Sequence, residues 1–180
     1  VIPQREDTLQ KPHSPYACAK VASEKYLLHL HEAYGFPVTI LRPFNTYGRT
    51  DNRHFLVEKA VTQALLNETM RLGDPTPMRD LLYVDDHVEG YLAAIRRIGT
   101  NLGIFNLCTG QSYSVSAVID MIKELTGYQR QVQWHTIPPR PLDIQHLQGD
   151  YSWASNRLGW KPKYTLEQTI QKMYAKRTSP

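Results

Sequence analysis

The chain has 180 residues, of which 41% are hydrophobic, and this is enough for one core and a small second lobe. A formal charge of +4 would suit an anionic ligand, but without a Lys/Arg run it does not favour nucleic acid as a partner. No segment approaches the roughly 20 apolar residues that span a bilayer, so we expect no membrane partner and a cytoplasmic location. Two cysteines are too few for a disulfide framework or a thiolate zinc site, and we expect no metal.

The first third of the chain predicts a helix followed by a strand. The sequence opens without Met and runs directly into a helix from about Tyr16 to Tyr34, which suggests that the chain starts partway through a domain. Ser14 is the expected N-cap of this helix, and Gly35 is expected to end it. The β-branched run at 38–41 predicts a strand buried on both faces of a parallel sheet. Residues 42–48 then form a turn at the carboxyl end of that strand, where open α/β sheets bind their ligands.

The rest of the chain continues to alternate between segments with the apolar pattern of a helix and segments with that of a strand. Helices are expected at 55–66, from Asp85 or Asp86 as a cap to about Arg97, from Ser114 to about Leu125, and at 152–158 and 166–174, with strands at 70–72, 81–84, 104–107 and 132–134. Such an alternation is typical of an α/β architecture. We expect a small lobe to fold over the edge of the main sheet.

A tyrosine and a lysine in the first helix form the most informative pair. Tyr16 and Lys20 are four positions apart, so both side chains lie on one face of the helix. A cation beside a phenolate favours the ionised phenol, and this would make Tyr16 usable as an acid or base near neutral pH. By itself the spacing is weak evidence, because surface helices commonly carry a solvated Lys and a half-buried Tyr.

Five ordered motifs agree with a catalytic interpretation of that pair. They are SPYACAK at 14–20, LRPFNTYG at 41–48, RDLLYVDD at 79–86, FNL with TG at 105–110, and RPLD at 140–143. Together they resemble the extended short-chain dehydrogenase/reductases, specifically the carboxy-terminal portion of the NAD-dependent nucleotide-sugar epimerases and dehydratases, of which UDP-glucose 4-epimerase is one type. The likeness covers nearly all 180 residues.

The resemblance implies how the chain is divided. It predicts the carboxy-terminal part of a Rossmann-like, doubly wound parallel sheet together with a small α/β substrate-binding lobe. Residues 1–48 would be the remainder of the dinucleotide-binding domain, and residues 49–180 would be mainly the nucleotide-sugar lobe. Residues 85–107 would return to the sheet.

The resemblance also assigns catalytic and cofactor-binding roles. Tyr16 would be the base that removes the proton from a sugar hydroxyl as hydride passes to NAD, and Lys20 would assist it and hold the nicotinamide ribose. Pro43 and Phe44 would lie beside the nicotinamide. NADP stays open as the cofactor, because the residue that selects between the two would lie upstream of Val1.

Five further residues are implied to bind the nucleotide sugar. Asn45 would contact the diphosphate or the sugar, and Leu72 would flank the nucleobase. Arg79 and Arg140 would bind the two phosphates, since a guanidinium offers forked, permanently charged donors. Asp143 would accept hydrogen bonds from the nucleoside ribose. The plainer interpretations are a surface ion pair for each charged residue and a buried strand residue for Leu72.

Several departures leave the activity open. The sequence contains no glycine-rich strand-to-helix turn, and the family's catalytic Ser or Thr would lie upstream of Val1. Ala19 replaces a common Ser, and Arg49 replaces a common Pro. The first expectation is an NAD-dependent nucleotide-sugar epimerase that transiently oxidises the C4 hydroxyl, and the close alternative is a 4,6-dehydratase or decarboxylase. The other alternative is a truncated, non-catalytic nucleotide-sugar-binding or dimerising module.

The implied partners are a nucleotide-diphospho-sugar and a second copy of the chain. The helices at 16–34 and 55–66 resemble those that form the family's dimeric four-helix bundle. Their second apolar faces could equally be covered by the missing amino-terminal half of such an enzyme. We expect a homodimer through this bundle.

Overall fold

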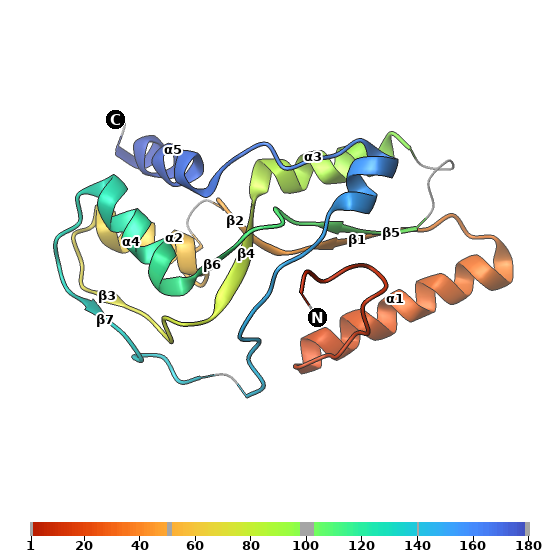
Figure 1. The fold of residues 1–180 in the computed structure, drawn as a ribbon, viewed down its shortest axis with the longest axis horizontal. Helices are drawn as coiled ribbons and strands as arrows, with labels where there is room; N and C mark the ends of the chain where they lie inside the picture. Colours follow the sequence, from red (N-terminus) through yellow and green to blue (C-terminus); the bar gives the residue numbers. More distant parts are fainter. Residues whose placement is uncertain (1, 50–51, 98–102, 140, 179–180) are drawn as a thin grey trace.

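The computed structural model describes residues 2–49, 52–97, 103–139 and 141–178. Its helices are α1 (Pro15–Tyr34), α2 (Leu56–Leu65), α3 (Val84–Ile95), α4 (Val115–Thr126) and α5 (Leu166–Thr178), with one π-helical segment, η1 (Ala154–Leu158). Its strands are β1 (Thr39–Pro43), β2 (Asn45–Tyr47), β3 (Met70–Arg71), β4 (Met78–Tyr83), β5 (Gly103–Leu107), β6 (Ser112–Ser114) and β7 (Val132–Gln133). Strands and helices alternate as predicted, and the α/β class is confirmed (Figure 1).

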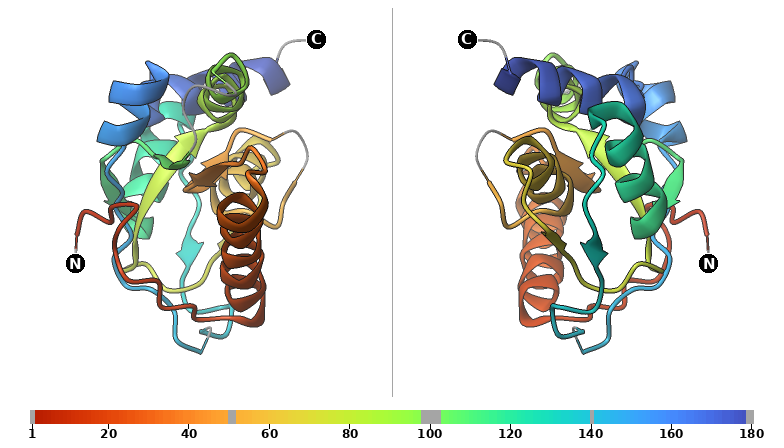
Figure 2. Two further views of the ribbon diagram at one scale, coloured as in Figure 1. Left: turned by 90° about the vertical axis from the view of Figure 1, so that its right-hand side faces the viewer. Right: turned by 90° about the vertical axis from the view of Figure 1, so that its left-hand side faces the viewer.

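Helix α1 begins and ends where local sequence rules place its ends. The hydroxyl of Ser14 accepts a hydrogen bond from the backbone N–H of Ala17 at 3.1 Å, which satisfies one of the free donors of the first turn. Gly35 ends the helix in the left-handed conformation, with φ of 66°. Within α1, which is described along its whole length, Glu24 is the one buried residue. The helix therefore lies on the outside of the molecule, along one side of β1 and β5 (Figures 1 and 2).

The chain changes sheets at Phe44. Strand β1 runs parallel to β5, with register pairs from Thr39 and Gly103 to Pro43 and Leu107. The next residue, Phe44, donates its N–H to the carbonyl of Leu107 at 2.9 Å, and β2 then pairs in parallel with β4. The prediction of a turn at 42–48 was therefore wrong for most of the segment, because each half finds its own strand partner.

The burial of β1 also differs from the prediction. Its residues are half-buried, apart from an exposed Pro43, whereas a strand covered on both faces was expected. In the part of the chain that the structure describes, β5 is the one strand paired with β1. The apolar run at 38–41 thus belongs to a partly covered strand that hydrogen-bonds to one neighbouring strand among the described residues.

Two hydrophobic clusters flank the strands. The larger packs α2, α4 and α5 together over β2–β4, with fully buried residues that include Val57, Ala60, Val61, Val118, Ile119, Ile122 and Ile170. The smaller joins β4, β5, α3 and η1 through Leu82, Ala94, Phe105, Leu107, Ala154, Leu158 and Trp160. The hydroxyls of Tyr47 and Thr169 hydrogen-bond inside the larger cluster and tie β2 to α5. Strands β2, β3 and β4 therefore rest on a well-packed helical layer.

The start of α3 differs from the prediction. Tyr83, and neither Asp85 nor Asp86, occupies the N-cap, and both acids lie in the first turn. Asp86 is fully buried, and its carboxylate accepts hydrogen bonds from the backbone N–H groups of Lys163 and Tyr164 at 3.0 and 3.2 Å. The carboxylate therefore fixes a distant segment to α3, whereas a role as a helix cap was expected. Strand β6 was not predicted, because its three residues carry no clear alternation.

Two predictions about the surroundings of the chain remain predictions. Helices α1 and α2 lie apart along the long axis of the molecule (Figure 1), and no partner chain tests the predicted bundle. Among the described residues, no helix combines the length and the apolar character needed to cross a bilayer.

Candidate active site

Tyr16 and Lys20 lie together on the outer surface of α1. The Lys20 ammonium is 5.5 Å from the centre of the Tyr16 ring, as expected for residues one helical turn apart. The Tyr16 side chain is 72% exposed, and Lys20 is exposed as well. The phenol therefore has a cation beside it and an open approach for a reacting molecule.

An ion pair joins the middle of α1 to β1. The Arg42 guanidinium donates from Nε to one oxygen of Glu24 at 2.9 Å and from Nη2 to the other. Burial opposes ionisation of Glu24, but the hydrogen bonds and charge of Arg42 outweigh it, so the pKa of the carboxyl lies below its ordinary value. Tyr16 precedes Glu24 by two helical turns, or about 12 Å of helix, so the ion pair holds the helix that carries Tyr16 against β1.

Pro43, Phe44 and Asn45 follow at that carboxyl end. Pro43 and Asn45 are exposed, and Phe44 is half-buried. The ring of Phe44 lies over Gly149, where a Cβ would come within 2.6 Å of the ring and of the Cys108 sulfur. The absence of a side chain at Gly149 is therefore what allows Phe44 its position.

Arg79 and Asp143 are bound to each other. The Nη2 atom of Arg79 donates to both carboxylate oxygens of Asp143 at 3.1 and 3.2 Å, and its Nη1 atom donates to the carbonyl of Ile144 at 2.6 Å. The Arg79 side chain is 16% exposed and the Asp143 side chain 32% exposed. The two residues were predicted to contact different parts of a ligand, and the structure brings them together as one unit at the rim of β4.

Asp80 organises the loops around this pair, a role that sequence reasoning missed. Its fully buried carboxylate accepts from the N–H and hydroxyl of Thr109 at 2.8 and 2.7 Å, and from the N–H groups of Gly110 and Gly149 at 3.0 and 3.2 Å. Burial raises the pKa of Asp80 above its ordinary value, against the effect of these four hydrogen bonds. The signal that could have revealed it is the Arg79–Asp80 dipeptide at the start of a strand.

Leu72 does not join the site. The Leu72 side chain is 1% exposed and packs in the larger hydrophobic cluster, so its surroundings are other apolar side chains, with no surface left for a nucleobase. Its backbone N–H and carbonyl are also engaged, with Gln133 and Thr136. Arg140 lies outside the described residues. The segment that follows it passes on the same side of the molecule as the start of α1 (Figures 1 and 2).

The sequence of the chain matches a known family over most of its length. The family described as GDP-mannose 4,6 dehydratase matches residues 1–173. The chain belongs to this family. One relative is a dTDP-glucose 4,6-dehydratase from Xanthomonas campestris pv. campestris, 30% identical over 173 residues that make up 92% of this chain and 49% of the relative. The expected membership of the nucleotide-sugar epimerases and dehydratases is thereby confirmed.

Solved structures of family members have the same fold. The UDP-glucose 4-epimerase of Thermotoga maritima, determined with UDP-glucose, is 33% identical and superimposes with a TM-score of 0.88, covering 99% of this chain and 58% of its own. The UDP-glucuronic acid 4-epimerase of Bacillus cereus, determined with UDP-glucuronic acid and NAD, is 26% identical with a TM-score of 0.86, covering 94% and 54%. The chain spans about half the length of the relatives it matches.

The described residues of this family member fit one end of a nicotinamide cofactor. Tyr16 and Lys20 are exposed on α1, Pro43 is exposed at the carboxyl end of β1, and the ring of the following Phe44 lies against Gly149. These groups could hold a ribose and an aromatic amide. No group of three or more metal-ligating side chains lies together in the described ranges.

Proposed function

We propose that the protein is an NAD-dependent nucleotide-sugar epimerase that transiently oxidises the C4 hydroxyl of the sugar. The observation that carries this proposal is the Tyr16–Lys20 pair, which is exposed on α1, the helix that the Glu24–Arg42 ion pair joins to β1. The family membership and the epimerases among its solved relatives support it. A 4,6-dehydratase, the activity of a 30% identical relative, begins with the same oxidation and is the alternative.

In this proposal the chain's own residues handle the proton and the ligand's charge. Tyr16 would take the proton from the sugar hydroxyl, with the Lys20 ammonium 5.5 Å from the centre of its ring. Asn45 offers an exposed amide to the sugar or diphosphate. The Arg79–Asp143 unit, with Arg140, would receive the nucleoside diphosphate part.

The cofactor would be NAD or NADP. When bound, it supplies the hydride acceptor for the oxidation. Lys20 would hold the ribose hydroxyls, and Pro43 and Phe44 would orient the nicotinamide. The NAD in the B. cereus relative supports this choice of cofactor class.

Removal of one hydroxyl tests the proposal. Tyr16→Phe in the whole protein should reduce interconversion of a UDP-sugar and its C4 epimer by about 10²- to 10⁴-fold, the usual contribution of a positioned acid or base. Tyr26→Phe is the matched control, because Tyr26 is also on α1 and 64% exposed, and its activity should stay within about twofold of the wild type. Full turnover in Tyr16→Phe would overturn the proposal. Formation of a 4-keto-6-deoxy product by the unaltered protein would instead identify the dehydratase.

A further inference from the structure

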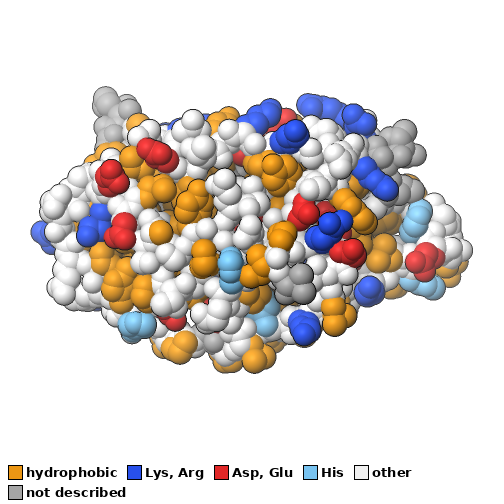
Figure 3. Space-filling view, viewed as in Figure 1, with side chains coloured by type: hydrophobic (Ala, Val, Ile, Leu, Met, Phe, Trp, Pro, Cys, Tyr) orange, Lys and Arg blue, Asp and Glu red, His pale blue; other side chains and the backbone are white. Residues whose placement is uncertain are grey.

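A second cavity lies away from the residues used above. It has a volume of about 650 Å³, within the range of small-molecule sites, and it lies between the second half of α3 and residues 158–163. Four cationic side chains line it, Arg96 and Arg97 from the α3 side and Lys161 and Lys163 from the facing segment. Lys and Arg side chains gather at this upper right edge of the molecule (Figure 3). The proposed function does not use any of these residues.

The facing segment is held rigidly against α3. Gly159 adopts φ of 68°, which turns the chain back after η1. The Trp160 indole N–H then donates to the Asp86 carbonyl at 3.0 Å, and the Asp86 carboxylate accepts from the backbone N–H of Lys163 at 3.0 Å. Because Asp86 and Trp160 are 0% and 4% exposed, the wall that carries the lysines is anchored in the core.

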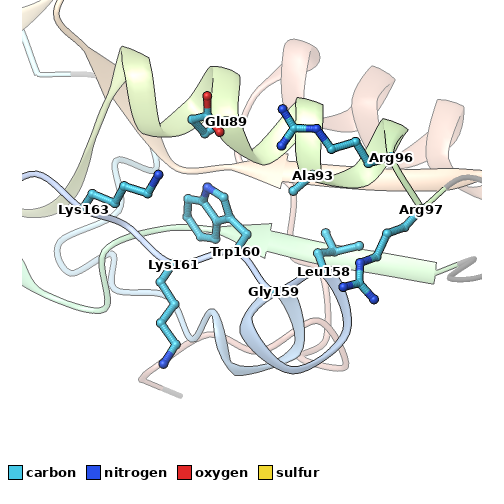
Figure 4. Close-up of a pocket in the computed structure, with 9 residues that line it drawn as sticks. All are labelled: Glu89, Ala93, Arg96, Arg97, Leu158, Gly159, Trp160, Lys161 and Lys163. Carbon is cyan, nitrogen blue, oxygen red and sulfur yellow. The ribbon is translucent and has the colours of Figure 1, made fainter.

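Arg96 and Lys163 extend into the same part of the cavity from its two walls. Figure 4 shows the Lys163 ammonium and the Arg96 guanidinium above Trp160 on either side of the Glu89 carboxylate, with Lys161 and Arg97 turned away from them. Within the described parts of the chain, Arg96, Lys161 and Lys163 form no ion pair. Bringing such charges together costs free energy that a bound anion would offset.

A simpler explanation accounts for the two arginines of the cavity. Arg96 and Arg97 follow the last turn of α3, where cations favourably meet the negative end of the helix dipole. That effect gives no reason for Lys163, which comes from another segment and lines the same cavity. Convergence of cations from two separate elements is the expected pattern for recognition of a multivalent anion.

We propose that this cavity binds a phosphate-bearing small molecule, of the size of a diphosphate, at a site independent of Tyr16 and Arg79. The forked donors of Arg96 and the ammonium of Lys163 would share its phosphate oxygens. Ala93, Leu158 and Trp160 supply a small apolar floor. The floor allows the ligand to carry an organic group beyond its phosphates. Glu89 is the one acidic side chain in the lining and would repel the ligand.

Calorimetric titration of the protein with inorganic pyrophosphate, and separately with UDP and ADP, tests this site. Arg96→Glu and Lys163→Glu should each weaken pyrophosphate binding at least tenfold, and Glu89→Gln should tighten it severalfold. Arg130→Glu is the control, because Arg130 is an exposed cation outside the cavity, and it should leave the affinity unchanged. Binding of UDP or ADP that is tighter than that of pyrophosphate, that Arg96→Glu weakens and that Arg79→Ala leaves unchanged would identify an organic phosphate as the ligand. Equal binding would identify the inorganic ion.

Three results would overturn the proposal. They are the absence of binding, an affinity that neither Arg96→Glu nor Lys163→Glu changes, and complete loss of binding in Arg79→Ala, which would assign it to the proposed nucleotide-sugar site. All four altered side chains at positions 89, 96, 130 and 163 are at least partly exposed, so the variants should fold, and circular dichroism verifies this. Lys163→Gln, a smaller change, should weaken binding less than Lys163→Glu does.

Discussion

Arg79 and Asp143 are 64 positions apart in the sequence, yet the guanidinium of one donates to both carboxylate oxygens of the other. Arg79 also donates to the carbonyls of Met78 and Ile144, so it holds the loop around Asp143 against the start of β4. The pair is thus a structural connection and, in the proposed function, part of the ligand-binding surface. A guanidinium in this position is pre-oriented, because its carboxylate partner and two carbonyls restrict its rotamers.

The two roles of this pair can be separated by Arg79→Lys. A lysine keeps the charge but loses the forked geometry, so we expect nucleotide-sugar affinity to fall at least tenfold, while the free energy of unfolding falls by about 1 kcal/mol. Titration calorimetry and urea unfolding measure the two effects. The variant Asp143→Asn, combined with Arg79→Lys, completes a double-mutant cycle that gives the coupling between the residues. An unchanged affinity in every variant would leave the pair with a structural role alone.

The ion pair of Glu24 and Arg42 should make the stability of the protein depend on pH. The pKa of Glu24 is lowered in the folded state, so at acidic pH the unfolded chain binds the proton more readily than the folded chain does. The stabilisation is therefore present above the unfolded value of about 4.3 and is lost as the pH falls through the lower, folded value.

Comparison of the wild type with Glu24→Gln isolates this effect from other carboxylates. The wild type should be more stable at pH 7, and the difference in free energy of unfolding between the two proteins should shrink toward pH 3. Urea titrations at several pH values provide the measurement. A constant difference across that range would contradict the assignment of the pH dependence to Glu24.

Gly149 should tolerate no side chain. A Cβ at this position would lie 2.6 Å from both the Phe44 ring and the Cys108 sulfur, so Gly149→Ala forces Phe44 or the backbone to move. We expect a loss of about 1–3 kcal/mol in the free energy of unfolding, the usual cost of overpacking. Gly73→Ala is the control, since the nearest heavy atom to its Cβ would be 3.9 Å away, and it should change stability by less than about 0.5 kcal/mol.

The Asp80 carboxylate should be essential to the order of the loops around the site. In Asp80→Asn one of the two oxygens becomes an amide donor, which would leave N–H groups such as those of Gly110 and Gly149 facing another donor. Each stranded donor costs roughly 1–3 kcal/mol, so urea unfolding should show a loss at the upper end of that range. Asp120→Asn alters an exposed residue of α4 and should have little effect. Equal stability of both variants would refute the proposed role of Asp80.

Much of the fold could be read from the sequence because its determinants are local. The hydroxyls of Ser14 and Ser114 cap the helices that follow them, and Gly35 and Gly127 end those helices in the left-handed conformation. A cap depends on residues within one turn, so it is visible in the order of residues. The Tyr16–Lys20 pair belongs to the same class, because helical spacing alone brings the two side chains together.

Tertiary structure alone decided which distant groups meet. The sequence left an ion pair open for Arg79 and for Asp143 without naming a partner, and the structure pairs them with each other. It left Leu72 open between a position beside a nucleobase and a buried strand position, and the structure places it in the core. It predicted Asp85 or Asp86 as a helix cap, whereas the fold uses the Asp86 carboxylate to bind the backbone of Lys163 beside a cationic cavity. Burial and long-range pairing depend on how elements pack, and packing is a property of all the elements at once, which no single segment of sequence specifies.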